Sequence, residues 1–360
     1  MAKMAQMGKR NFCHDPFNTI ASIAVLIAGF GSEDVKLLFE AYKLNTAFKT
    51  PKECLQAFKE TDVSDIYTAV VIYLVSKKFT VSKKFHELLE YYRYAYLGED
   101  VDFEKDAKRE EKEIERFIDE IVDDSINKEF FKLFVLKPEY DLVYMSVSAY
   151  LASLQLSEKS HKYVHSVFYN HGDEKVTIRM KNIKCEMKFA SFIEYTVVDI
   201  NMESDEHILF IRPNSEHGLE RMLAYIDYKM INETLNTLEL KMVDFMHPII
   251  NVTSTRTVNS YIQDQDFSHL FSRNASLSNL VDSNEIYVSE VYQFTTVQLN
   301  SSAIASNKLY NEYENDNTDT DLKTFHLNHP FLYFIFSNND NILLYSGYVN
   351  QIADINNFEE

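Results

Sequence analysis

The sequence predicts an α+β protein in which N-terminal helices pack on a large, mainly antiparallel central sheet with further sheets. Apolar side chains recur at helical spacing between residues 18 and 135, whereas short apolar runs of strand length begin near residue 163. Apolar residues make up 46% of the 360-residue chain and charged residues 25%, which supports a large core and excludes a disordered chain. No linker rich in Pro, Gly or Ser separates the halves, so we expect a single domain over residues 1–360.

The helices are expected in the first half of the chain. Residues 20–30 form an apolar run of eleven residues, which is too short to cross a bilayer and predicts a buried helix. Residues 104–124 are strongly charged but keep apolar side chains on one side, which predicts an amphipathic helix with a solvated face. The apolar positions of this helix are Ile114, Phe117, Ile118 and Ile121.

The strands are expected from residue 163 onward. The candidate segments are 163–168, 175–180, 188–194, 197–200, 208–212, 238–245, 287–299, 330–336 and 342–349. The run at 331–335 is wholly apolar, as expected for a strand that is buried on both faces. We expect the last two candidate strands to pair as buried neighbours.

Composition argues against several classes of function. The chain has 55 acidic and 36 basic residues, a net charge of −19, which would repel a nucleic-acid backbone or an anionic membrane. It has only seven glycines, and it contains no glycine-rich phosphate loop and no hydrolase motif. We therefore expect a protein that is not an enzyme and that needs no cofactor.

Residues 317–321 imitate the start of a calcium-binding loop. Asn317, Asp319 and Asp321 alternate with threonines, as the first ligands of such a loop would. Leu322 stands where the loop requires glycine, and Asn328 stands where it requires glutamate. We expect a solvated loop and no calcium.

Histidine and cysteine offer no stronger site. His161 and His165 could share a metal on a helix, but no third ligand lies near them in sequence. Cys13 and His14 are adjacent, so their side chains point in different directions and do not predict a catalytic thiol. The three cysteines, Cys13, Cys54 and Cys185, allow at most one disulfide.

Four N-glycosylation sequons favour a secreted protein. They begin at Asn232, Asn251, Asn274 and Asn300. No signal-peptide cleavage site follows the apolar run at 20–30, so any signal peptide is expected to be missing from this sequence already. We expect an extracellular monomer.

The C-terminal sequence resembles the closing hairpin of the serpin family. Residues 328–335 (NHPFLYFI) and 342–350 (ILLYSGYVN) carry the most specific part of the resemblance. Residues 268–280 and 287–291 resemble the approach to the strand that precedes the serpin reactive loop. Residues 73–79, 101–103 and 126–133 match the family's second helical block and the turn after the long charged helix. The resemblance covers nearly the whole chain from about residue 11.

The resemblance implies a protease inhibitor with an exposed reactive-centre loop at about 301–324. In the family, a protease cleaves this loop, which then inserts into the main sheet and carries the acyl-linked protease with it. The implied hinge consists of Ser301, Ser302, Ala303, Ile304, Ala305, Ser306 and Lys308. The scissile region consists of Asn317, Thr318, Asp319, Thr320 and Asp321.

The scissile region indicates the class of the target protease. It offers no Lys, no Arg and no large apolar residue, so a trypsin-like pocket with an acidic floor would reject it. We expect the target to be a cysteine protease. The alternative is a non-inhibitory serpin-fold protein that binds or carries a ligand, because Lys308 is unfavourable in an inserted strand.

Four features depart from the family pattern. Residues 15–18 are Asp-Pro-Phe-Asn, whereas the family usually has Ser-Pro-Leu-Ser beneath the main sheet. Gln293 replaces a usual histidine, the chain has no Trp, and the first helix is short or missing. The altered positions help the central sheet to open in the family, so the changes bear on sheet opening here.

Overall fold

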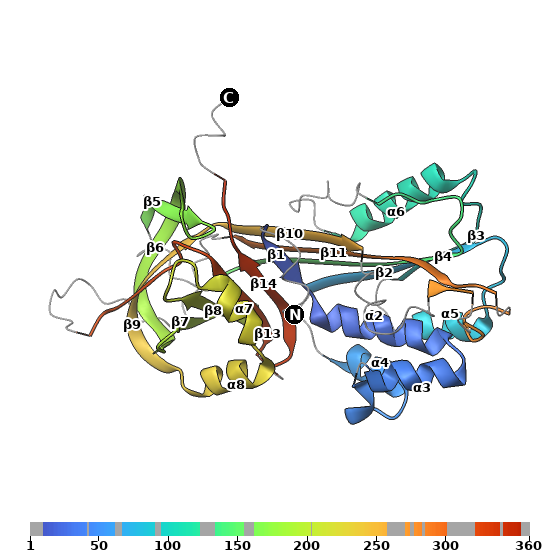
Figure 1. Cartoon of the computed structure of the whole chain (residues 1–360), viewed down its shortest axis with the longest axis horizontal. Helices are drawn as coiled ribbons and strands as arrows, with labels where there is room; N and C mark the ends of the chain where they lie inside the picture. The colour runs from blue at the N-terminus through green and yellow to red at the C-terminus, as the bar shows by residue number, and fades with distance from the viewer. Residues whose placement is uncertain are drawn as a thin grey trace. The chain divides into compact units, whose positions relative to one another are not determined.

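A computed structural model shows the architecture of the chain (Figure 1). It describes residues 10–41, 43–61, 67–90, 95–122, 134–154, 162–202, 204–257, 271–273, 277–282, 285–300, 321–338 and 341–353. The chain divides into two compact units. Unit 1 comprises Met1–His14, Leu151–Val252 and Val297–Glu360, and unit 2 comprises Asp15–Tyr150 and Thr253–Thr296.

Unit 2 contains the N-terminal helices. They are α2 (Pro16–Gly29), α3 (Ser32–Ala41), the 3-10 turn η1 (Leu44–Thr46), α4 (Pro51–Glu60), α5 (Lys83–Leu89) and α6 (Ala107–Ile121). Asp15 caps α2 and Pro16 begins it, which is a favourable pairing at a helix start. In α6, Ile114 and Ile118 are buried on one side, as the amphipathic pattern predicts.

The helices of unit 2 pack against a five-stranded sheet. Its strands are β10 (Ile250–Thr257), β11 (Val288–Asn300), β4 (Leu142–Ser153), β2 (Tyr67–Ser76) and β3 (Ala95–Val101), in that spatial order. β2 runs antiparallel to β4 and parallel to β3. The core under this sheet joins side chains of α2, such as Val25, to Tyr73 on β2 and Val291 on β11. Figure 1 shows α2 and α6 on opposite faces of this sheet.

Unit 1 is built on a nine-stranded sheet. Eight strands follow in the order β1 (Phe12–His14), β14 (Leu343–Val349), β13 (Phe331–Ser337), β8 (Glu206–Pro213), β7 (Tyr195–Asn201), β6 (Glu174–Ser191), β9 (Glu239–Pro248) and β12 (Lys323–His326). The ninth, β5 (Lys162–Asn170), pairs with β6. Two short helices, α7 (Leu219–Tyr225) and α8 (Tyr228–Asn236), contribute Met222 and Ile231 to a core with Leu209 and Phe334.

The structure confirms the α+β class and the C-terminal pair of strands. β13 and β14 run antiparallel, with Phe331 opposite Val349, and every residue of β13 is buried. No helix of the described residues is long and apolar enough to span a membrane. The single-domain expectation stays a prediction.

Three expectations about secondary structure were wrong in part. β2 and β3 interrupt the region expected to be helical, and β2 includes most of the segment 73–79 that was matched to a helical block. From Val70 to Ser76 every residue of β2 is buried, so both faces of the strand carry buried side chains and the alternation that marks a half-buried strand is missing. The candidates at 175–180 and 188–194 form one long strand, β6, and the helices α7 and α8 interrupt the strand-rich half.

Gly347 supplies a test of the packing in unit 1. A Cβ atom at this position of β14 would overlap the Phe12 carbonyl oxygen on β1 and the Tyr333 ring on β13. Because the Phe12 oxygen is backbone and cannot move aside, we expect Gly347→Ala to lower the free energy of unfolding by about 1–3 kcal/mol. The measurement is urea unfolding. Gly98→Ala is the control, because its nearest neighbour is the end of the flexible Leu74 side chain, at 2.8 Å, and its loss should be smaller.

Candidate functional site

The predicted reactive loop connects two described strands. β11 ends at Asn300, and the described chain resumes at Asp321, just before β12. The hinge residues Ser301, Ser302, Ala303, Ile304, Ala305, Ser306 and Lys308 lie outside the described residues, as do Asn317, Thr318, Asp319 and Thr320 of the scissile region. Asp321 is exposed and accepts a hydrogen bond from Lys323 at 2.6 Å, which lowers the pKa of its carboxyl group.

β11 pairs directly with β4 in the five-stranded sheet. Side chains add to this pairing at both ends within unit 2. Ser289 Oγ on β11 accepts a hydrogen bond from the Asp141 N–H at 2.8 Å, just before β4. Further along, Ser148 Oγ on β4 donates to Thr295 Oγ1 on β11 at 3.3 Å. We call the line between these strands the β4–β11 seam, and a new strand could enter there only if the two strands separated.

The first turn of α2 bonds to both sides of the seam. Asn18 Nδ2 donates to Ser146 Oγ on β4 at 2.9 Å. Gln293 Nε2 on β11 donates to Thr19 Oγ1 at 2.5 Å. The N-terminus of one helix therefore links the two strands that would have to part, through one bond to each strand.

Asp15 lies at the centre of this polar cluster. Its carboxylate accepts hydrogen bonds from the Asn18 N–H at 2.7 Å and from the Tyr67 hydroxyl on β2 at 2.8 Å. The side chain of Ser148 on β4 bonds to it as well. Asp15 is only 1% exposed, and this burial raises the pKa of its carboxyl group to about 7, while the hydrogen bonds oppose the rise.

The sequence pointed to this cluster only through its departures from the family pattern. Asp15, Asn18 and Gln293, which stand in altered positions, belong to one hydrogen-bonded group. Nothing in the local sequence of Tyr67 or Ser148 indicates that their hydroxyl groups bond to a carboxylate. The described residues show no structural feature that the absence of tryptophan explains.

The histidines and cysteines singled out in the sequence do not assemble into a reactive site. Cys13 Sγ donates to the Val252 carbonyl oxygen at 3.2 Å, within unit 1. All three cysteines are free and buried, and burial raises the pKa of Cys54 to about 11 and that of Cys185 to about 12. His161 lies outside the described residues, and His165 is exposed on β5. Over the described part of the chain, no group of three or more His, Cys, Asp or Glu side chains could hold a metal ion.

The described sequons are accessible. The side chain of Asn232 is exposed on α8, and that of Asn251 is exposed on β10. Asn274 lies outside the described residues, and the side chain of Asn300 at the end of β11 does too. Glycosylation at these four positions therefore stays a prediction.

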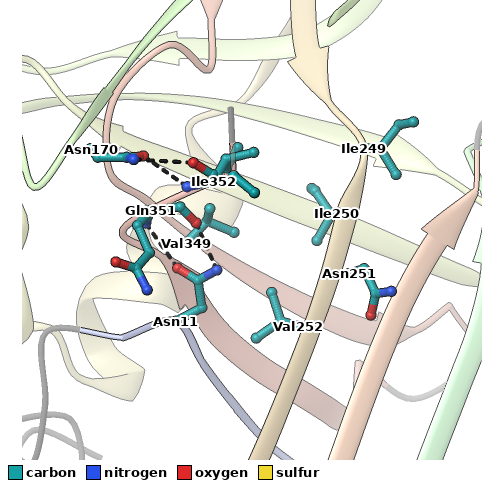
Figure 2. A pocket seen from close by; sticks show the side chains of 10 residues that line it. Asn11, Asn170, Ile249, Ile250, Asn251, Val252, Val349, Gln351 and Ile352 are labelled. Carbon is teal, nitrogen blue, oxygen red and sulfur yellow. Dashed lines mark hydrogen bonds between the residues drawn. The ribbon is translucent and has the colours of Figure 1, made fainter. Parts of the chain in front are cut away.

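Among the cavities of unit 1, two differ in their lining. The larger, of about 610 Å³, lies beside the C-terminal segment 349–353. Figure 2 shows its wall, where Asn11 accepts from the Gln351 N–H at 2.9 Å and Asn170 from the Ile352 N–H at 2.7 Å. None of the described residues that line it is charged, so it offers amide and aliphatic groups and no strong metal ligand.

The second cavity, of about 260 Å³, is lined by α8 and by three interacting polar side chains. Lys188 Nζ lies 3.2 Å from Asp199 Oδ2, and His207 Nδ1 lies 2.6 Å from Asp199 Oδ1. Because this cavity is more polar and partly charged, it suits a ligand with a charged or hydrogen-bonding group.

Comparisons with known proteins agree on one family. The family model described as "Serpin (serine protease inhibitor)" matches residues 1–352. "Iripin-8" of Ixodes ricinus is 21% identical over 193 residues, 51% of this chain and 48% of that protein. "Serpin B12" of Mus musculus is 23% identical over 261 residues, 70% of this chain and 62% of that protein. In both cases the chain spans less than two thirds of the relative's length.

Solved structures show the same fold at lower sequence identity. A crystal structure of maspin aligns with a TM-score of 0.80 at 13% identity, over 98% of this chain and 95% of that one. Uncleaved ovalbumin aligns with a TM-score of 0.78 at 14% identity, over 97% and 95%. A thyroxine-binding globulin complex with thyroxine aligns with a TM-score of 0.79 at 15% identity, over 97% and 95%.

Tyr67→Phe tests the bond to Asp15. At pH 8 the carboxyl is ionised, so loss of this donor should lower the free energy of unfolding by about 1.5–3 kcal/mol. At pH 5 the carboxyl is neutral, and the loss should be only about 0.5–1.5 kcal/mol. Tyr228→Phe is the control, because Tyr228 is 76% exposed and should change little at either pH. Equal losses for Tyr67→Phe at the two pH values would contradict the assignment.

Proposed function

The chain belongs to the serpin family, and we propose that it inhibits a protease through the loop at 301–324. The observation that carries the proposal is the direct pairing of β4 with β11. The predicted loop follows β11 without a break in the chain, and a strand that entered between β4 and β11 could pair with both. Such an insertion supplies the free energy that trapping requires.

We propose a cysteine protease as the target. The protease thiolate would attack the carbonyl carbon of the scissile peptide bond, the C–N bond would break, and the amine would leave with a proton. A thioester would then join the two proteins. The exposed carboxylate of Asp321 and the polar residues before it would be rejected by a trypsin-like pocket with an acidic floor.

The hinge sets the outcome after cleavage. In an inserted strand Ile304, Ser306 and Lys308 would share the buried face, and burying an unpaired Lys308 costs several kcal/mol. Hydrolysis of the acyl bond does not depend on this cost. We therefore infer that cleavage without trapping competes with trapping.

Covalent trapping can be measured on a denaturing gel. The chain is incubated with papain and, separately, with trypsin, and the fraction in an SDS-resistant complex is compared with the fraction cleaved. We expect a complex with papain and none with trypsin. Cleavage between 315 and 322 by papain without any complex would contradict the inhibitory proposal.

Lys308→Ala tests the hinge. Because it removes the charge that insertion would bury, we expect it to raise the trapped fraction several-fold at an unchanged rate of loop cleavage. Asn307→Ala is the matched control, since residue 307 would lie on the other face of the inserted strand and its variant should partition like the parent. If Lys308→Ala and the parent partition identically, the hinge does not limit trapping.

A second candidate function is a non-inhibitory binding or carrier protein. The cavity with Lys188, Asp199 and His207 favours it, because its wall carries paired polar groups that a ligand could contact. One solved structure with the same fold is a thyroxine-binding globulin complexed with thyroxine. Saturable binding of a small molecule that is lost in Lys188→Ala, together with no protease complex, would favour this candidate.

We further propose that the protein is an extracellular monomer. The exposed Asn232 and Asn251 support glycosylation and hence secretion. Expression in a secreting cell, followed by a mass shift on glycosidase treatment, tests the proposal.

A further inference from the structure

We propose that Asp15 makes the β4–β11 seam sensitive to pH: a neutral Asp15 keeps the two strands paired, and an ionised Asp15 favours their separation. The biological consequence, pH control of loop insertion, rests on the proposed inhibitory function. The change in the seam itself does not, because it concerns the uncleaved protein.

The Asp15 carboxylate lies among the hydrogen bonds that must break when β4 and β11 separate. Asp15 caps α2, whose first turn bonds to β4 through Asn18 and to β11 through Thr19. The Asp15 carboxyl group also bonds to the Ser148 hydroxyl on β4, and the oxygen of this hydroxyl lies 3.3 Å from Thr295 Oγ1 on the other side of the seam. Parting the strands breaks this chain of bonds and admits water to the carboxylate.

The groups around Asp15 do not balance its charge. The titratable side chains that face it are the phenols of Tyr67 on β2, whose hydroxyl donates to the Asp15 carboxylate, and Tyr144 on β4. Burial raises the pKa of Tyr144, so this phenol is neutral near pH 7. β11 contributes Gln293 and Thr295, which are uncharged, and α2 contributes Asn18 and Thr19.

Among the described residues, no Lys, Arg or His forms an ion pair with Asp15. An ionised Asp15 in the closed seam is therefore a buried charge stabilised by hydrogen bonds alone, which is unfavourable compared with the same charge in water.

The direction of the effect follows from proton binding. In the closed seam, burial raises the pKa of Asp15 to about 7, whereas in water its pKa would be about 4. The closed seam therefore binds the proton more tightly, and its advantage is complete below about pH 4 and is lost as the pH rises through 7. These two values predict that the equilibrium constant for opening rises about tenfold between pH 6 and pH 8 and levels off above pH 8.

Hydrogen exchange of the whole, uncleaved chain tests this inference without any protease. Protection of the amides in 142–150 and 288–296 is measured from pH 5 to 9 and corrected for the intrinsic dependence of exchange on pH. We expect protection to fall about tenfold between pH 6 and pH 8. A change of less than twofold over this range would overturn the proposal, whatever the outcome of the inhibition assay.

Variants assign the effect to Asp15. Asp15→Asn should remove the pH dependence, and Asp15→Ser, which keeps a capping oxygen, serves if the amide variant does not fold. Asp227→Asn is the matched control, because Asp227 caps α8 in the same way, accepting from the Met230 N–H at 2.8 Å, but is exposed. It should keep the tenfold change.

Tyr67→Phe gives an independent readout. It removes a bond that lowers the pKa of Asp15, so it should move the midpoint of the transition to higher pH. An unshifted midpoint, or pH dependence that persists in the Asp15 variants, would show that another group is responsible.

Discussion

The pairing of β4 with β11 is the constraint on which the rest of the five-stranded sheet depends. Each strand has its other edge occupied, β4 by β2 and β11 by β10, so neither can find a new partner elsewhere in the sheet. Separation would leave two rows of backbone N–H and C=O groups unpaired, a cost that only water or another strand can offset. The proposed reactive loop follows β11 in the chain and is the candidate for that strand.

Hydrogen bonds from the start of α2 also hold β4 and β11 in place. They involve the polar cluster of Asp15, Asn18, Thr19, Tyr67, Ser148 and Gln293. The apolar core of unit 2 holds α2 against the sheet, but apolar contact has no direction and tolerates sliding. The bonds from Asn18 to β4 and from Gln293 to Thr19 fix the helix relative to each strand separately. The buried Oδ1 of Asn18 has no hydrogen-bond partner among the described residues. The cluster is thus incompletely satisfied, which lowers the cost of opening it compared with a fully bonded network.

The sequence predicts what depends on local pattern and misses what depends on distant neighbours. The wholly apolar run at 331–335 predicts a buried strand, and the one-sided apolar pattern of α6 predicts an amphipathic helix. The sequence does not predict β2 as a strand, because most of its residues are buried and polar and apolar side chains do not alternate along it. The sequence shows Asp15 as unusual, but the pKa of its carboxyl group depends first on burial by the folded chain. It depends next on hydrogen bonds from distant residues, such as Tyr67, which is 52 positions away. The hinge and most of the scissile region lie outside the described residues, so those assignments rest on sequence.

An ionised carboxylate at the start of α2 lowers the free energy of unfolding, whereas a hydroxyl group would cap the helix equally well. Raising the pKa of a carboxyl from about 4 to about 7 corresponds to roughly 4 kcal/mol of lost stability once the group is ionised. This is a large part of the roughly 5–15 kcal/mol by which a domain is stable. A serine at this position would avoid the penalty but would give the seam no response to pH. When Asp15 is ionised, it therefore destabilises the closed β4–β11 seam, and the proposed mechanism requires these two strands to separate.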